Sequence, residues 1–209
     1  MNNAMYRKLA LGLIAAWFVF ALIASALHLY RASSGAPPLA IGLGVSIPIM
    51  IFLAWFGLSP GFRAFVLSLD AGALTRFNAW RFAGFTFLVL YAYGLLPGIF
   101  ALPAGLGDMA VALTAFSAAK KFADPEKRGA FITWQILGAI DLVTAVTLGS
   151  TAGWFDPGAA AMTPISVLPL SVIPTFGVPL YLIFHIICIL QARRLPEGLP
   201  RGLGEPSAA

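Results

Sequence analysis

The sequence predicts an all-α membrane protein with six transmembrane helices, both termini cytoplasmic, and a short interfacial helix between spans two and three. The composition is the first observation behind this fold class: 60% of the residues are hydrophobic and 10% are charged, against about 45–50% and about 25% in soluble proteins. Mean hydropathy is +0.90, and several apolar runs reach the roughly 20 residues that a helix needs to cross a bilayer. Lys and Arg also gather in alternate loops, as the positive-inside rule requires.

The first two spans are expected over residues 9–30 and 38–58. The first follows Arg7 and Lys8, and it is longer than the apolar core of a signal peptide, which has about 7–15 residues. We therefore expect it to stay in the membrane. Pro48 predicts a kink in the second span, because a proline removes one intrahelical hydrogen bond.

A short amphipathic helix is predicted directly after the second span. Ser59 and Pro60 are residue types that favour an N-cap and a first helical position. The apolar positions that follow repeat at helical spacing: Phe62, Phe65, Val66, Leu69 and Ala73. Because charged residues lie off this stripe, we expect a helix that lies in the membrane surface.

The third span is expected from Phe77 or Arg81 to Phe100, and an irregular connection is expected after it. Residues 96–107 contain two prolines and three glycines in apolar surroundings, a composition that disfavours regular helix. The next apolar segment, residues 108–122, is short for a full crossing. We therefore expect the connection to dip into the bilayer, where neighbouring helices shelter its backbone.

A polar hairpin leads into the last two spans. Asp124 and Pro125 favour the cap and first position of a helix, and the fifth span is placed over residues 129–150. The sixth segment covers residues 165–191 and is interrupted by Pro169, Pro174 and Pro179. Discontinuous helices of this kind occur in many secondary transporters, where the freed backbone lines a cavity.

The positions of the basic residues predict the orientation. With both termini cytoplasmic, the outer side holds one basic residue, Arg31, and the inner side holds the other 12 of the 13: Arg7, Lys8, Arg63, Arg76, Arg81, Lys120, Lys121, Lys127, Arg128, Arg193, Arg194 and Arg201. This contrast predicts a multi-pass protein of the inner (plasma) membrane. We expect residues 1–192 to form a single six-helix transmembrane domain and residues 193–209 a disordered cytoplasmic tail.

The same residues exclude several classes of protein. Cys188 is the only cysteine, so an intrachain disulfide and cysteine-rich zinc or iron–sulfur sites are excluded. The basic residues flank apolar runs, which explains the net charge of +5 by membrane orientation rather than by nucleic acid. We expect no cofactor and no metal. The expected partners are the lipid bilayer and either a second copy of the chain or another membrane protein.

Polar residues inside the spans are the candidate functional residues, because each costs a few kcal/mol to place in a bilayer. The candidates for substrate or ion binding are Asp141, Asp108, His185, Gln135 and Arg81. Asp141 should lie near the midplane, where it must be protonated, meet a cation or pair with a group on another helix. His185 and Gln135 should lie in the inner half and Arg81 at the inner boundary. We expect His185 either to hydrogen-bond within the bundle, with Gln135 as one candidate partner, or to bind a proton.

Asp108 has two interpretations beyond a carboxylate at a helix N-terminus. If the preceding connection dips inward, Asp108 approaches Asp141, and the two carboxylates share a proton or hold a cation. Residues 105–108, Gly-Leu-Gly-Asp, also resemble the G-x-G-D motif of intramembrane aspartyl proteases, including the type 4 prepilin peptidases. The resemblance covers four residues and implies a second catalytic aspartate, Asp141 or Asp70. Asp70 is predicted at the opposite face, and Asp141 follows the motif instead of preceding it.

Three functions remain open from the sequence. The first is a small permease or proton- or ion-linked transporter with a polar core around Asp141, Asp108 and His185. The second is a non-enzymatic accessory or assembly protein, whose buried polar groups serve packing alone. The third is an intramembrane aspartyl protease, which is the only one of the three that requires catalytic residues.

Overall fold

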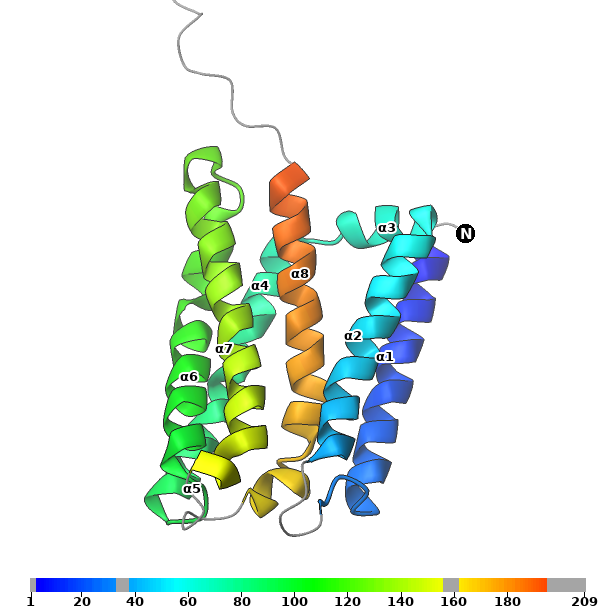
Figure 1. Cartoon of the computed structure of the whole chain (residues 1–209). Coiled ribbons are helices and arrows are strands. Elements are labelled where there is room, and N and C mark those ends of the chain that lie inside the picture. Colours follow the sequence, from blue (N-terminus) through cyan, green and yellow to red (C-terminus); the bar gives the residue numbers. More distant parts are fainter. Residues whose placement is uncertain (1–2, 33–37, 156–161, 195–209) are drawn as a thin grey trace, which may run out of the picture.

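The computed structural model describes residues 3–32, 38–155 and 162–194, and all the regular structure in these ranges is helical. Its long helices run side by side (Figure 1) and are α1 (Asn3–Ala26), α2 (Leu39–Leu58), α6 (Gly98–Lys121), α7 (Arg128–Phe155) and α8 (Val178–Arg194). Shorter elements connect them: α3 (Pro60–Leu67), α4 (Ala71–Phe77), η1 (Asn78–Gly84), α5 (Phe85–Ala92), η2 (Pro125–Lys127), η3 (Thr163–Ser166) and η4 (Ile173–Gly177).

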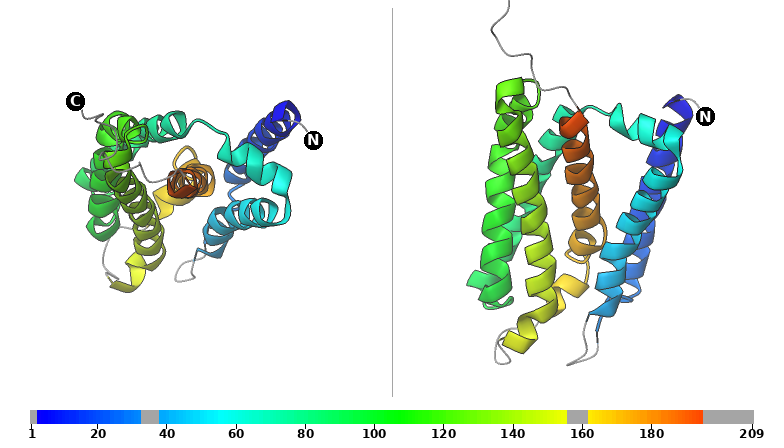
Figure 2. Two further views of the ribbon diagram at one scale, coloured as in Figure 1. Left: turned by 90° about the horizontal axis from the view of Figure 1, so that it is seen from above. Right: turned by 45° about the horizontal axis from the view of Figure 1, so that its top comes forward.

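Five stretches of the described chain are long and apolar enough to cross a membrane, consistent with an all-α membrane protein: Asn3–Ala26, Leu39–Leu58, Gly98–Lys121, Pro125–Gly153 and Ile173–Arg194. The beginning of α1 and the end of α8 lie at the same end of the bundle (Figure 1), which we call the terminal end. The opposite end, which holds Tyr30 and Met162, is called the loop end. Seen from above, α8 lies between α1–α3 on one side and α4–α7 on the other (Figure 2).

The predicted amphipathic helix is α3, which lies across the terminal end (Figure 1). The Ser59 side chain accepts a hydrogen bond of 3.2 Å from the Phe62 amide, and Pro60 is the first helical residue. Phe62, Phe65 and Val66 are buried in a cluster with residues from α1, α2 and α8. The helix is shorter than predicted, however, because Asp70 starts a new helix by accepting from the Ala73 amide at 3.1 Å.

The expected third span differs most from the structure. The chain turns into the bundle at Ala71, earlier than Phe77 or Arg81, and α4, η1 and α5 continue one another as far as Ala92. A 3₁₀ segment lies in their middle, so this stretch is not one continuous long helix. The sequence concealed its start because Asp70 and Arg76 are typical of a membrane surface, where they are in fact exposed and paired at 3.5 Å.

The prediction that residues 96–107 dip into the bilayer as an irregular connection is wrong. The turn is confined to residues 93–97, with Gly94 at a φ of +69°, and α6 begins at Gly98 and runs for 24 residues. Pro103 lies inside this helix. Helix is favoured here despite the composition, because it satisfies the backbone without water, and small residues let neighbouring helices approach closely.

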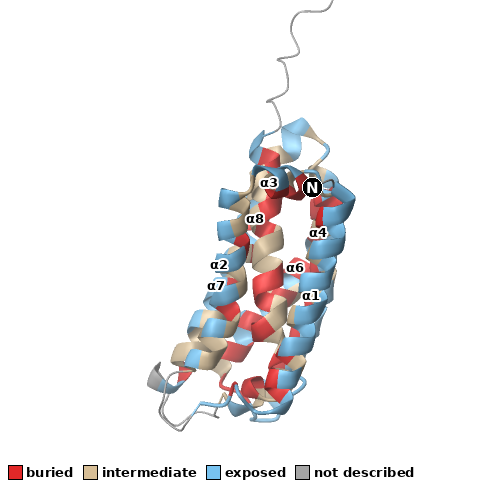
Figure 3. Cartoon of the chain, turned by 90° about the vertical axis from the view of Figure 1, so that its right-hand side faces the viewer, coloured by how far each residue is buried: buried red, intermediate tan, exposed pale blue. Residues whose placement is uncertain are grey.

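The sixth segment is also divided. Residues 163–166 form η3, and the continuous apolar stretch starts later, at Ile173, as the π-helix η4 followed by α8. Of the expected tail, Arg193 and Arg194 belong to α8, and residues 195–209 lie outside the described residues, as does Arg201. The outward faces of α1 and α2 are exposed over most of their length (Figure 3), as expected of helices that contact lipid.

Candidate functional site

Arg81 lies at the centre of a buried ionic cluster made by η1, α6 and α7. Its Nε donates to Asp108 Oδ1 at 2.7 Å, its Nη1 donates to the Gly138 carbonyl at 3.2 Å, and its Nη2 donates to Asp141 Oδ2. The exposed fractions of the side chains are 1% for Arg81, 12% for Asp108 and 19% for Asp141. We call these three residues the charged layer. Every guanidinium nitrogen has an acceptor, as a charge removed from water requires.

The prediction that Arg81 lies at the inner boundary is wrong. Arg81 follows ten helical residues that begin at Ala71, so it lies about 15 Å along the chain from the cap at Asp70. This depth brings it level with Asp108 and with Asp141, which is midway along α7. Asp141 therefore pairs with a group on another helix, the third of the possibilities that the sequence left open. That group is an arginine of this chain.

Three glycines make room for the charged layer and for the ring of His185 beside it. A Cβ atom built on Gly84 would overlap the Asp108 carboxylate, and one built on Gly107 would overlap the carboxylate of Asp141. On Gly138 it would come within 2.6 Å of the His185 ring. These distances are shorter than packed carbon and oxygen atoms allow, so each glycine is required by a close approach between elements.

A second group of polar side chains lies on the terminal side of the charged layer, and its members are joined by hydrogen bonds rather than by ion pairs. His185 Nδ1 lies 2.6 Å from Gln135 Oε1, and Gln135 Nε2 donates to Thr75 Oγ1 at 2.8 Å. Thr75 Oγ1 in turn donates to the Ala71 carbonyl at 2.7 Å. All three side chains are fully buried. We call this chain of hydrogen bonds, which joins α8, α7 and α4, the polar plug.

The hydrogen bonds of the polar plug indicate which ring nitrogen of His185 carries the proton. Because Gln135 presents its oxygen to Nδ1, Nδ1 carries the hydrogen, and Nε2 is then an acceptor in the neutral ring. Nε2 has no hydrogen-bond partner among the described residues. Since the Gly138 backbone contacts both this ring and Arg81, the polar plug and the charged layer are adjacent.

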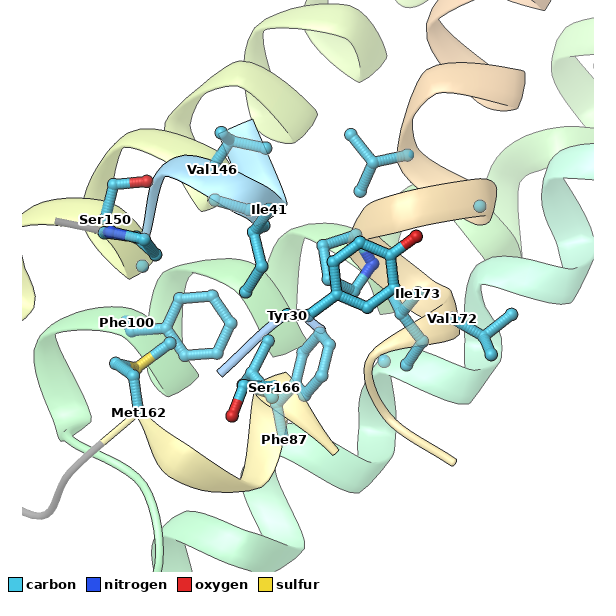
Figure 4. A pocket seen from close by; sticks show the side chains of 18 of the residues that line it. Tyr30, Ile41, Phe87, Phe100, Val146, Ser150, Met162, Ser166, Val172 and Ile173 are labelled. Carbon is cyan, nitrogen blue, oxygen red and sulfur yellow. The ribbon is translucent and has the colours of Figure 1, made fainter. Parts of the chain in front are cut away.

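A cavity of about 700 Å³ extends from the loop end to the charged layer. Arg81 and Asp108 are among its lining residues, as are Tyr30 and Met162 at the loop end. Figure 4 shows Phe87, Phe100, Val146 and Ile173 around it. Its volume falls in the range of small-molecule sites, about 300–1,000 Å³, and such sites typically combine apolar walls with a few polar groups.

The structure brings together all five candidate residues, in two groups. Arg81, Asp108 and Asp141 form the charged layer, and His185 and Gln135 pair as expected. Thr75 was not among the predicted site residues, because the sequence placed it before the third span. Nor was Tyr181, which lines the cavity; tyrosine four residues before His185 lies on the same helix face, which was the available signal.

Two carboxylates and one guanidinium give the charged layer a formal charge of −1 when all three are ionised. A proton or a cation can balance this charge. Hydrolysis is less favoured by the same geometry, because an aspartyl protease needs its two carboxylates free to hold one water molecule. Here both carboxylates are held by Arg81. Among the described residues, no group of three His, Cys, Asp or Glu side chains could hold a metal ion.

The fold is thus all-helical in its described parts and consistent with a membrane protein, and the site is an ionic cluster at the closed end of a cavity. Residues 38–193 match the family described as Domain of unknown function (DUF8737), and the chain belongs to this family. The match includes α2 to α8 and hence the charged layer and the polar plug. Neither the curated proteins nor the solved structures include a match.

Proposed function

We propose that this protein is a small six-span permease of the inner membrane, linked to protons or ions through the charged layer. The observation that carries the proposal is the cavity that ends on Arg81 and Asp108 in the middle of the bundle. Ionisable groups at such a depth cost free energy and are typical of coupling sites in transporters. Because the charged layer has one more carboxylate than guanidinium groups, binding a proton or a cation would neutralise it.

The proposal counts α4, η1 and α5 as the third span. These elements have 7, 7 and 8 residues, together 22, which is the length of an ordinary transmembrane helix. They run beside α6 toward the loop end (Figure 1). With this span the chain crosses six times, so both termini share one side, and the basic residues at the terminal end make that side cytoplasmic.

The orientation can be tested by cysteine labelling. Cys188 is fully buried, so the natural chain provides a background with low reactivity. Ala32 at the loop end and Ala123 at the terminal end are both exposed, and each can be replaced by cysteine. A maleimide that does not cross membranes should label Ala32→Cys in intact cells and Ala123→Cys only after permeabilisation. The reverse pattern would overturn the proposed orientation.

The coupling role can be tested by thermal unfolding of the purified protein across pH and a panel of cations. A ligand that binds the folded state raises the unfolding temperature, so the wild type should be stabilised by a proton or by a particular cation. Asp141→Asn removes the excess charge while keeping the side-chain shape, and should abolish this dependence. Asp124→Asn, at a partly exposed aspartate of the α6–α7 hairpin that pairs with Lys127 at 2.8 Å, is the control for the loss of a carboxylate outside the charged layer.

The opposite result would favour a second function. If Asp141→Asn only lowers stability by the same amount at every pH and with every cation, linked transport is overturned and the buried polar groups serve packing. The exposed apolar faces of α1 and α2 then favour an accessory or assembly role in contact with another membrane helix. Chemical cross-linking in native membranes would show whether that helix belongs to a second copy of this chain.

A further inference from the structure

We infer that the cavity binds an apolar organic cation, such as a lipophilic amine or a quaternary onium ion, in exchange for a proton. The inference deepens the proposed function, on which it rests, by naming the substrate class. Three observations lead to it: the charge of the layer at the cavity's inner end, the way in which Arg81 is engaged, and the side chains of the cavity wall.

The first observation is the excess of one carboxylate over guanidinium in the charged layer. Among the described residues, Asp108 is the only acidic one that lines the cavity, and it is held by one hydrogen bond from Arg81 Nε to Oδ1. Its other oxygen, Oδ2, lies closest to the position of a Cβ on Gly84, and Gly84 also lines the cavity. A cationic ligand in the cavity next to Asp108 would therefore be attracted by the negative charge of this carboxylate, which Arg81 neutralises only in part.

The second observation, that the nitrogens of Arg81 are already engaged, argues against an anion as the ligand. Arg81 is the only basic group at the inner end, and its three nitrogens already donate to Asp108, Gly138 and Asp141. An anion would have to displace one of these acceptors and would add a third negative charge. The other basic lining residue, Arg31, is exposed at the loop end, where water screens its charge.

The third observation is the aromatic character of the wall. Of the lining residues that the structure describes, six are aromatic: Tyr30, Trp80, Phe87, Phe100, Phe176 and Tyr181. Aromatic faces attract cations electrostatically, and this attraction is stronger where water is excluded. An organic cation with an apolar body can therefore contact the rings while its charge lies near Asp108. A hydrated metal ion would leave most of this wall without contacts.

The exchange is balanced in charge. In the empty state a proton on one of the two carboxylates makes the charged layer neutral. When the cation arrives, this proton leaves to water and the cation supplies the same positive charge. The titratable and charged groups that face the exchange are Arg81 from η1, Asp108 from α6, Asp141 from α7 and Tyr181 from α8. His185, one turn beyond Tyr181, lies in the adjacent polar plug.

The test compares two probes of matched size and shape and opposite charge, tetraphenylphosphonium and tetraphenylborate. Each is equilibrated with the full chain in phosphatidylcholine nanodiscs, and the bound fraction is measured by dialysis. Val146→Trp fills the cavity, whose wall includes Val146 (Figure 4). Val143→Trp places the same group on the exposed side of the same helix. The difference between these two variants is the binding that belongs to the cavity rather than to the lipid.

We expect the cavity to bind tetraphenylphosphonium about tenfold or more tightly than tetraphenylborate, because the two differ in their interaction with one carboxylate in a poorly screened site. Asp108→Asn should remove this preference and Asp124→Asn should retain it. Binding of the phosphonium should release protons into a weakly buffered solution and should weaken as the pH falls.

Two outcomes would overturn the inference. Equal cavity binding of both probes would show a ligand site without preference for cations and would leave the proposed permease function standing. Identical binding by the wild type, Val143→Trp and Val146→Trp would show that neither probe enters the cavity. The proposed function is judged separately, by the dependence of unfolding on pH and cations in Asp141→Asn. Because the cavity binding of each probe is the difference between Val143→Trp and Val146→Trp, the comparison of the two probes does not depend on the folding of Asp108→Asn.

Discussion

Replacing Arg81 with glutamine removes the cation that two carboxylates share. The geometry sets limits on the loss of folding stability that follows. Removing one partner from a buried ion pair costs about 3–5 kcal/mol, and Arg81 is 1% exposed with every nitrogen engaged. The protein can limit the loss by protonating one carboxyl group. In the unfolded chain an aspartate is ionised at pH 7 with an ordinary pKa of about 3.9, so a folded state that keeps one carboxyl protonated is destabilised by at most about 4 kcal/mol. Both routes predict a loss of about 3–5 kcal/mol.

The pH dependence of this loss has a definite sign. Protonating a carboxyl group becomes easier by about 1.36 kcal/mol for each unit by which the pH falls. The difference in stability between the wild type and Arg81→Gln should therefore be largest at neutral and alkaline pH and should shrink in acid. A variant that also carries Asp108→Asn and Asp141→Asn has no uncompensated charge, and should recover much of the lost stability at neutral pH.

Unfolding in mixed micelles of increasing dodecyl sulfate content, followed by tryptophan fluorescence, measures these differences. Arg31→Gln is the matched control, because Arg31 is exposed at the loop end and its replacement should change stability by less than about 0.5 kcal/mol. The reasoning is refuted if Arg81→Gln is as stable as the wild type at neutral pH. It is also refuted if the triple variant is less stable than Arg81→Gln alone.

Two further predictions concern the packing around the charged layer. Gly107→Ala should destabilise the protein by about 1–3 kcal/mol, because the new methyl group overlaps the Asp141 carboxylate. The control is Gly129→Ala, whose Cβ would meet nothing within 4 Å. It should be neutral or stabilising in the same unfolding assay. Gln135→Leu should cost about 1–3 kcal/mol for each buried group left without a partner, and nuclear magnetic resonance of the His185 ring should show its Nδ1 proton changing environment. An unchanged His185 spectrum in Gln135→Leu would contradict the hydrogen bond between them.

The apolar spans were predictable because the bilayer imposes a length and a composition that can be read locally. The interfacial helix was predictable for a similar reason, since Ser59 and Pro60 act on their immediate neighbours. The start of α4 was not, because the polar residues just before and within it are equally suited to a surface helix. The glycines and prolines of residues 96–107 disfavour helix in water, but the membrane interior penalises an unpaired backbone more strongly.

The candidate residues were predictable one at a time, because each is expensive in a membrane. Their partners depend on which helices are neighbours and at what depth, and neither follows from the residues themselves. Arg81 illustrates this point: an error of a few residues in the start of its helix placed it at the membrane surface, far from Asp141. His185 and Gln135 could be paired because both belong to spans whose limits were nearly correct.

The cavity and the polar plug occupy opposite sides of the charged layer, and this asymmetry limits how anything could cross the protein. Thr75, Gln135 and His185 are fully buried, and none of them lines the cavity. The cavity therefore reaches the charged layer from the loop end without reaching the polar plug. In the proposed permease, a solute that has reached Asp108 would next meet the hydrogen bonds by which the plug joins α8, α7 and α4. Such a barrier is the defining requirement of alternating access, in which one gate closes before the other opens.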